Sequence, residues 1–130
     1  QRYRLGNKIK FIDHCKEMPL AYSLADVVVS ASVEPEAFGR VSVEAQAMEK
    51  PIIASDLGGS KETIIKEKSG FLYKHDDPRQ LAKAINKVIE FDQDTLNSIG
   101  NEGRKNITKK FDVELMCDST LREYKKLLKI

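Results

Sequence analysis

The residues with the clearest chemical potential in this sequence lie around the dipeptide Phe38-Gly39. The carboxylates Glu36 and Glu44 stand on either side of it. If the glycine opens a helix, the peptide N–H groups of residues 39–42 have no helical partner and attract an anion, typically a phosphate. Carboxylates accept hydrogen bonds from hydroxyl groups. We therefore predict a pocket for a phosphate flanked by hydroxyls, which is the chemistry of a nucleotide-sugar.

Short apolar runs alternate with amphipathic stretches along the chain, as in repeated strand-helix units with a parallel sheet. We expect strands at residues 9–12, 27–30, 52–55 and 70–73. The second and third are β-branched and lack polar alternation, which is typical of strands covered by helices on both faces. The predicted fold class is α/β, with a Rossmann-like parallel sheet and helices on both of its faces.

Helices are expected between and after these strands. Ser60 is the expected N-cap of one helix, and Gly70 the residue that stops it. The dipeptide Asp77-Pro78 supplies a capping acid and a first-turn proline for another, whose apolar residues recur with a 3.6-residue period. The last three helices are expected to cover one sheet face or to reach another domain. The expected ranges are 19–25, 40–49, 60–67, from Pro78 onward, 94–110 and from Asp112 onward.

Many polar and glycine residues fall on one predicted edge of the sheet. The loops there begin at Asp13, Ser30, Asp56 and Lys74, at the carboxyl ends of the four expected strands. Ligands of open parallel sheets bind outside the carboxyl ends of the strands. His14 on this edge is a candidate contact for a nucleotide base or an acceptor, although a lone loop histidine is also a common surface residue.

Bulk composition narrows the class of protein. The 130 residues, 41% hydrophobic and 32% charged, fit a single domain over residues 1–130. A net charge of +2 without a basic block gives no reason to expect a nucleic-acid partner. Metal-ligand spacing is missing from the sequence, and Cys15 and Cys117 stand far apart, as in a reducing cytoplasm. The apolar runs are shorter than the roughly 20 residues of a membrane helix.

Five segments stand in a characteristic order at residues 25–32, 35–41, 44–48, 51–54 and 58–64. In combination they closely resemble the donor-binding domain of GT-B retaining glycosyltransferases, the group that transfers sugars to lipids, lipopolysaccharide, polysaccharides or small acceptors. The likeness runs from about Ile9 to Tyr124. It implies that the chain is part of the C-terminal, nucleotide-sugar-binding domain of a GT-B fold.

The resemblance also implies roles for individual residues. Glu36 matches the glutamate that approaches the donor sugar and stabilises charge near the reacting carbon, so it is the candidate catalytic residue. Glu44 matches the glutamate that holds the ribose hydroxyls. Gly58 and Gly59 either lie near the donor sugar or form the turn out of a strand. The remaining implied donor contacts come from Phe38, Gly39, Arg40 and Val41.

The substrate implied by the resemblance is a nucleotide-diphosphate sugar, and no metal or other cofactor is expected. The leaving diphosphate would assist deprotonation of the acceptor, so that configuration is retained. A separate N-terminal domain would bind a lipid-linked, saccharide or small-molecule acceptor. The expected location is the cytoplasm, with peripheral association at the inner face of the membrane left open, and the expected role is cell-envelope or polysaccharide biosynthesis.

The sequence departs from the family pattern at two positions. The family commonly has glycine where Glu49 and Asp13 stand, so the turn at Glu49 and the base side of the pocket are expected to differ. The family's basic phosphate-binding pair, first two strands and acceptor domain lie upstream, so the chain alone is expected to be inactive. Two alternatives stay open: a GT-B nucleotide-sugar epimerase, and a non-catalytic nucleotide-sugar-binding or interaction domain.

Overall fold

Three parallel strands form the sheet, in the order β1-β2-β3. The computed structural model describes residues 5–129. The strands are β1 (Val28–Ser30), β2 (Ile52–Ser55) and β3 (Gly70–Tyr73), which confirms three of the expected strands. The central strand β2 is buried along its whole length.

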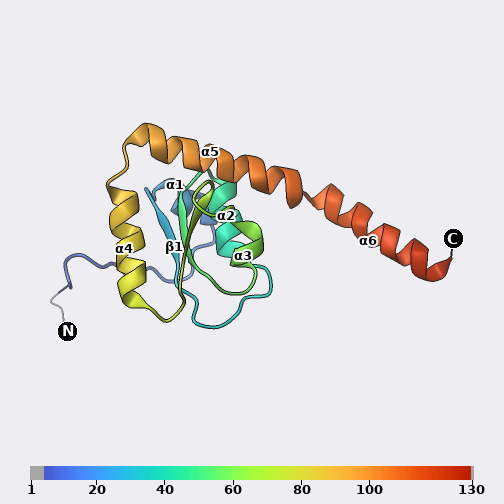
Figure 1. The fold of residues 1–130 in the computed structure, drawn as a ribbon, viewed down its shortest axis with the longest axis horizontal. Helices are drawn as coiled ribbons and strands as arrows, with labels where there is room; N and C mark the ends of the chain where they lie inside the picture. The colour runs from blue at the N-terminus through green and yellow to red at the C-terminus, as the bar shows by residue number, and fades with distance from the viewer. Residues whose placement is uncertain (1–4, 130) are drawn as a thin grey trace.

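Helices surround this sheet and continue beyond it. The long helix α5 (Gln93–Lys110) runs along one end of the body, and α6 (Val113–Leu128) continues away from it toward the C-terminus (Figure 1). Most of the predicted helices are confirmed, with small shifts at their ends. The helices are α1 (Met18–Ser23), α2 (Arg40–Ala47), α3 (Ser60–Thr63), α4 (Pro78–Ile89), α5 (Gln93–Lys110) and α6 (Val113–Leu128).

The side chains of β2 alternate between two buried clusters, as the pleat of a strand requires. Ile52 and Ala54 pack with residues of α1 and α2 on one face of the sheet. Ile53 packs with residues of α4 and α5 on the other face. Both faces are therefore covered by helices, which confirms the predicted fold class.

Helix α5 also packs closely against α2, because α5 carries glycine at the contact. A Cβ atom on Gly100 would lie 2.1 Å from the carbonyl oxygen of Glu49, and one on Gly103 would lie 3.1 Å from Cγ of Gln46. The buried amide of Gln46 donates from Nε2 to the carbonyl oxygen of Thr63 at 3.0 Å. This contact fixes α2, which begins at the candidate loop, against the rest of the fold.

The predicted strand at residues 9–12 is wrong. In the part of the chain that the structure describes, this segment pairs with no strand, and Ile9, Phe11 and Ile12 are 47%, 96% and 83% exposed. A strand needs a neighbour for its backbone N–H and C=O groups. The apolar residues are as predicted, but no described strand lies beside this segment to pair with it.

The predicted helix 60–67 is too long, because α3 ends at Thr63. Ile64 takes an extended conformation (φ −108°, ψ 127°). Its side chain, 5% exposed, packs in the core on the α1–α2 face of the sheet. Glu67 then adopts a left-handed conformation (φ 62°), which a helix cannot continue through. Burial of one isoleucine therefore prevails over helix propensity here.

Two residues predicted as helix signals have other roles. Ser60 is the first residue of α3 instead of its N-cap, which is Gly59. Gly70 opens β3 instead of ending a helix. A Cβ atom on Gly70 would lie 2.6 Å from Cγ2 of Ile52, so close strand packing explains this glycine. Across residues 5–129, none of the helices has the length and apolar character needed to cross a membrane.

Candidate functional site

The candidate site begins at Gly39, where the chain turns into α2. Gly39 has a left-handed conformation (φ 78°, ψ 54°) that favours glycine. Within residues 5–129, the peptide N–H groups of Gly39, Arg40 and Val41 have no hydrogen-bond acceptor. The prediction that the N–H of Ser42 is also free is wrong, because it donates to the carbonyl oxygen of Gly39 at 3.0 Å. Three unsatisfied N–H groups with the helix dipole make this end of α2 suited to an anion.

Glu36 is held on the loop that leads into this turn. Its half-buried carboxylate accepts a hydrogen bond from the hydroxyl of Ser32, and its carbonyl oxygen accepts one from the N–H of Gly59 at 2.8 Å. The first contact orients the side chain, and the second ties the loop to the segment before α3. Glu36 is therefore a fixed carboxylate close in sequence to the anion-attracting turn.

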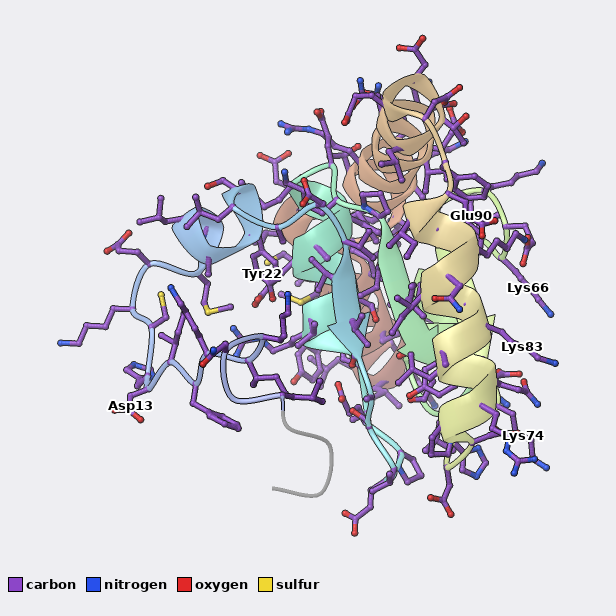
Figure 2. All side chains as sticks on the ribbon, turned by 90° about the vertical axis from the view of Figure 1, so that its left-hand side faces the viewer. Asp13, Tyr22, Lys66, Lys74, Lys83 and Glu90 are labelled. Atoms are coloured by element: carbon purple, nitrogen blue, oxygen red, sulfur yellow. The ribbon has the colours of Figure 1, made fainter. Side chains whose placement is uncertain are left out.

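Glu44 lies in α2 with one partner for each carboxylate oxygen. Oε2 accepts from Oη of Tyr22 at 2.9 Å, and Oε1 accepts from Nη2 of Arg40 at 2.9 Å. Tyr22 belongs to α1 and lies between that helix and the body of the fold (Figure 2). Burial, and then the hydrogen bond to Glu44, raise the pKa of Tyr22 to about 12, so its hydroxyl stays protonated and donates at neutral pH.

Gly58 and Gly59 bring a second loop against the candidate loop. Gly58 has φ 54°, and a Cβ atom there would lie 2.4 Å from the carbonyl oxygen of Glu36. A Cβ atom on Gly59 would lie 2.4 Å from the backbone of Phe38. Between the two alternatives left open by the sequence, these contacts favour the structural one, because both glycines allow backbone packing that positions Glu36 and Phe38.

Phe38 faces the junction between α5 and α6. Its ring is 45% exposed and meets the ring of Phe111 edge to face, with centroids 5.5 Å apart and planes at 69°. Beside this pair lies a hollow of about 420 Å³. Its lining is formed by Phe38, Lys110, Phe111, Asp112, Val113, Leu115, Met116 and Ser119.

The segment before α1 carries His14, whose contact with a nucleotide base or an acceptor stays a prediction. His14 is exposed, and Asp13 projects from the outer edge of this segment (Figure 2). Neither residue is among the partners that hold Glu36 and Glu44 in the described chain. Over residues 5–129, no group of His, Cys, Asp and Glu side chains could hold a metal ion.

Glu49, where the resemblance predicts glycine, adopts a left-handed backbone conformation of the kind that favours glycine. Its φ is 57°, and its N–H donates to the carbonyl oxygen of Gln46 at 3.0 Å. Its side chain pairs with Arg104 at 3.5 Å, although both side chains are about half exposed. The left-handed conformation costs a glutamate roughly 1 kcal/mol in steric strain, and a difference between this turn and that of the family stays a prediction.

Sequence reasoning missed the two hydroxyl partners of the glutamates, Tyr22 and Ser32. Tyr22 had a usable signal: a tyrosine on the buried side of a short helix needs a partner for its hydroxyl. Ser32 had none, because side-chain contacts inside an irregular loop follow no sequence period. Both residues act on the orientation of carboxylates that the sequence had already identified.

Comparisons with known proteins identify the family of this chain. The model of the family "Glycosyl transferases group 1" matches residues 1–106, and the chain belongs to this family. The capsular polysaccharide biosynthesis glycosyltransferase CapM of Staphylococcus aureus is 34% identical over 94 residues, which cover 72% of this chain and 24% of CapM.

Solved structures show the same fold. A glycosyltransferase from Rickettsia africae ESF-5 superposes with a TM-score of 0.91 and 35% identity, over 96% of this chain and 33% of that chain. Anabaena Alr3699/HepE, solved in complex with UDP-glucose, superposes with a TM-score of 0.89 and 30% identity, over 96% of this chain and 34% of that chain. The chain thus spans about a third of these proteins, and its fold is a partial C-terminal domain of a GT-B fold.

Proposed function

We propose that this chain forms part of a retaining glycosyltransferase that binds a nucleotide-diphosphate sugar and transfers the sugar to an acceptor hydroxyl. The observation that carries the proposal is the set of unsatisfied N–H groups at the start of α2, with Glu36 and Glu44 in the adjoining loop and helix. The likeness to HepE, a protein solved with UDP-glucose, supports a nucleotide-sugar donor and makes UDP-glucose the first donor to test.

Each residue of the proposed site has a physical task. The diphosphate rests against the N–H groups of Gly39, Arg40 and Val41, where the helix dipole favours negative charge. Glu44 accepts hydrogen bonds from the ribose hydroxyls. Glu36 accepts them from hydroxyls of the donor sugar and stabilises positive charge that develops at the anomeric carbon. The proposal includes no metal ion: the backbone N–H groups and the basic pair expected upstream of these residues would together stabilise the leaving diphosphate.

The proposed reaction retains configuration at the anomeric carbon. The acceptor oxygen attacks from the face that the diphosphate leaves. A carbon–oxygen bond to the acceptor forms, the bond to the diphosphate breaks, and the acceptor proton passes to a diphosphate oxygen. The site acts by orienting the donor and stabilising the leaving charge.

The acceptor in this proposal is a saccharide, a lipid-linked group or a small molecule that binds outside these 130 residues. We place the reaction in the cytoplasm, where the free thiols of Cys15 and Cys117 match reducing conditions. Association with the inner face of the membrane and a role in cell-envelope or polysaccharide synthesis are further parts of the proposal. The similarity to CapM, named for capsular polysaccharide biosynthesis, supports that role.

Replacing Glu36 with glutamine in the full-length protein tests the catalytic assignment. Glutamine keeps the shape of the side chain but removes its negative charge. We expect transferase activity to fall well over tenfold, which corresponds to about 1.4 kcal/mol of activation free energy per factor of ten. The matched control is Glu34→Gln, an exposed glutamate of the same loop, which should retain activity. Unchanged transfer by Glu36→Gln would exclude the proposed role.

Product analysis separates the proposal from its alternatives. Sugar moved to an acceptor supports transfer, whereas an isomerised nucleotide-sugar would identify an epimerase. A thermal-shift screen of nucleotides and nucleotide-sugars identifies the base, because a ligand that binds the native state raises its stability. Binding without turnover by the full-length protein would identify a non-catalytic domain. We expect no measurable transfer by the 130-residue chain alone.

A further inference from the structure

We propose that Tyr22 is a positioning residue that fixes the carboxylate of Glu44 for recognition of ribose hydroxyls. This inference rests on the proposed function, in which Glu44 binds the ribose. It adds a residue from α1, outside the segment that carries the two glutamates. It also predicts that the site prefers ribose to deoxyribose. This preference depends on the hydroxyl of Tyr22, which itself need not touch the ligand.

The ring of Tyr22 is well placed to act as an anchor. It is 6% exposed and belongs to the buried cluster that includes Ala45 and Ile52. Packing from α2 and β2 therefore fixes the ring, and only the hydroxyl reaches the half-buried carboxylate, at 2.9 Å from Oε2 of Glu44. A hydrogen bond to a charged acceptor is stronger than one between neutral groups.

The second partner of the carboxylate is held much less firmly. Arg40 donates to Oε1 of Glu44, but its side chain is 82% exposed and the pair is separated by a single helical turn. Exposed ion pairs of this kind contribute little to stability. An incoming ligand can therefore displace Arg40 from Oε1 at little cost, while Tyr22 continues to hold Oε2.

The two contacts together define how Glu44 would meet a ribose. With Oε2 fixed by the core, rotation of the carboxylate is restricted, and Oε1 is the oxygen that becomes free for sugar hydroxyls. Without the Tyr22 hydroxyl, the carboxylate can turn toward solvent and toward Arg40, and ordering it again on binding costs affinity. The loss of affinity should affect ligands that carry the 2′-hydroxyl of ribose and should not affect ligands that lack it.

Tyr22→Phe is the test, because it removes Oη and keeps the packed ring. Dissociation constants are measured by calorimetry on the full-length protein for UDP, GDP and ADP and for their 2′-deoxy forms. For the nucleotide that binds, we expect the wild type to prefer ribose by about tenfold. Tyr22→Phe should weaken binding of the ribonucleotide and reduce the preference toward unity, with little change for the deoxynucleotide.

Tyr73→Phe is the matched control. Tyr73 is also 6% exposed, but it lies in the cluster on the opposite face of the sheet. Its variant should keep the ribose preference, and thermal unfolding of both variants reports any general loss of stability.

The possible outcomes distinguish a failure of the positioning role of Tyr22 from a failure of the proposed function on which it rests. A Tyr22→Phe protein that keeps the full ribose preference would overturn the positioning role and leave the proposed function intact. Equal weakening of both nucleotide forms would also overturn it, because it indicates general disturbance of the fold. A wild type that binds nucleotides without preferring ribose, or binds none of them, would remove the assumed role of Glu44 and this inference with it.

Discussion

Helices α5 and α6 follow each other along the chain but relate to the fold in opposite ways. Helix α5 buries Ile99, Gly100, Gly103, Asn106 and Ile107 against the sheet and α2. Helix α6 carries more apolar side chains than α5, yet it has no buried residue and extends away from the body (Figure 1).

Local signals cannot explain this difference. Both helices begin at an aspartate N-cap whose carboxylate accepts a hydrogen bond from a backbone N–H, Asp92 in α5 and Asp112 in α6. What α5 has in addition is small residues at its contact with α2, and these allow the two backbones to approach. The comparison teaches that capping decides where a helix begins, whereas shape complementarity decides whether it is buried.

The strongest test of this comparison is Gly100→Ala, which inserts a methyl group into the α5–α2 contact. Alanine favours helix by up to about 1 kcal/mol over glycine. Its Cβ, however, would lie 2.1 Å from the carbonyl oxygen of Glu49, a backbone atom that cannot move alone. Overpacking costs about 1–3 kcal/mol or more. We expect a net loss of about 2 kcal/mol in the free energy of unfolding, measured by urea denaturation.

Asn101→Ala is the control for this variant, because Asn101 is the exposed neighbour in the same helix. It gains helix propensity without a steric clash and should stabilise the chain by a few tenths of a kcal/mol, roughly. If Gly100→Ala stabilised the chain as Asn101→Ala does, the proposed explanation for the burial of α5 would be wrong.

Glu49→Gly changes the other partner of the same contact, a residue just after the end of α2 whose carbonyl oxygen faces Gly100. The left-handed backbone at φ 57° costs glutamate roughly 1 kcal/mol that glycine does not lose. The exposed ion pair with Arg104 offsets only a small part of this gain. We expect stabilisation by about 0.5–1 kcal/mol, measured in the same denaturation assay. Glu49→Ala, which keeps a Cβ atom, should show no such gain, and equal stabilisation by both variants would argue against backbone strain.

The parts of the fold that sequence predicted well are those fixed by neighbouring residues in the chain. Strands β1 and β2 were found from their β-branched runs, β3 from its short apolar run, and α4 from Asp77, whose carboxylate does accept from the N–H groups of Arg79 and Gln80. Residues 9–12 have the same apolar character, but pairing depends on a neighbouring strand that no local pattern reveals. Ile64 likewise lies outside the helix predicted for it, because its side chain is buried in the core.

The features of the candidate site also fall into those that neighbouring residues in the chain determine and those that depend on distant residues. Glu36, Gly39 and Glu44 were identified from their order in the chain, and Gly39 does stand directly before a helix, as its N-cap. The contacts that orient them come from elsewhere: Tyr22 from α1, and Gly59 through its N–H to the carbonyl of Glu36. Long-range hydrogen bonds carry no sequence period, so the structure was needed to reveal them.

The smallest expected effect belongs to α6 and tests the other half of the comparison. Leu121 is 51% exposed, so replacing it with glutamine, a residue of similar helix propensity, removes little buried surface. We expect the free energy of unfolding of the 130-residue chain to change by less than about 0.5 kcal/mol, as is usual for surface substitutions. Gly100→Ala in the same assay shows that a loss of contact is detectable. A loss above about 1 kcal/mol for Leu121→Gln would mean that α6 packs against the body of the chain in solution, and the contrast between the two helices would then fail.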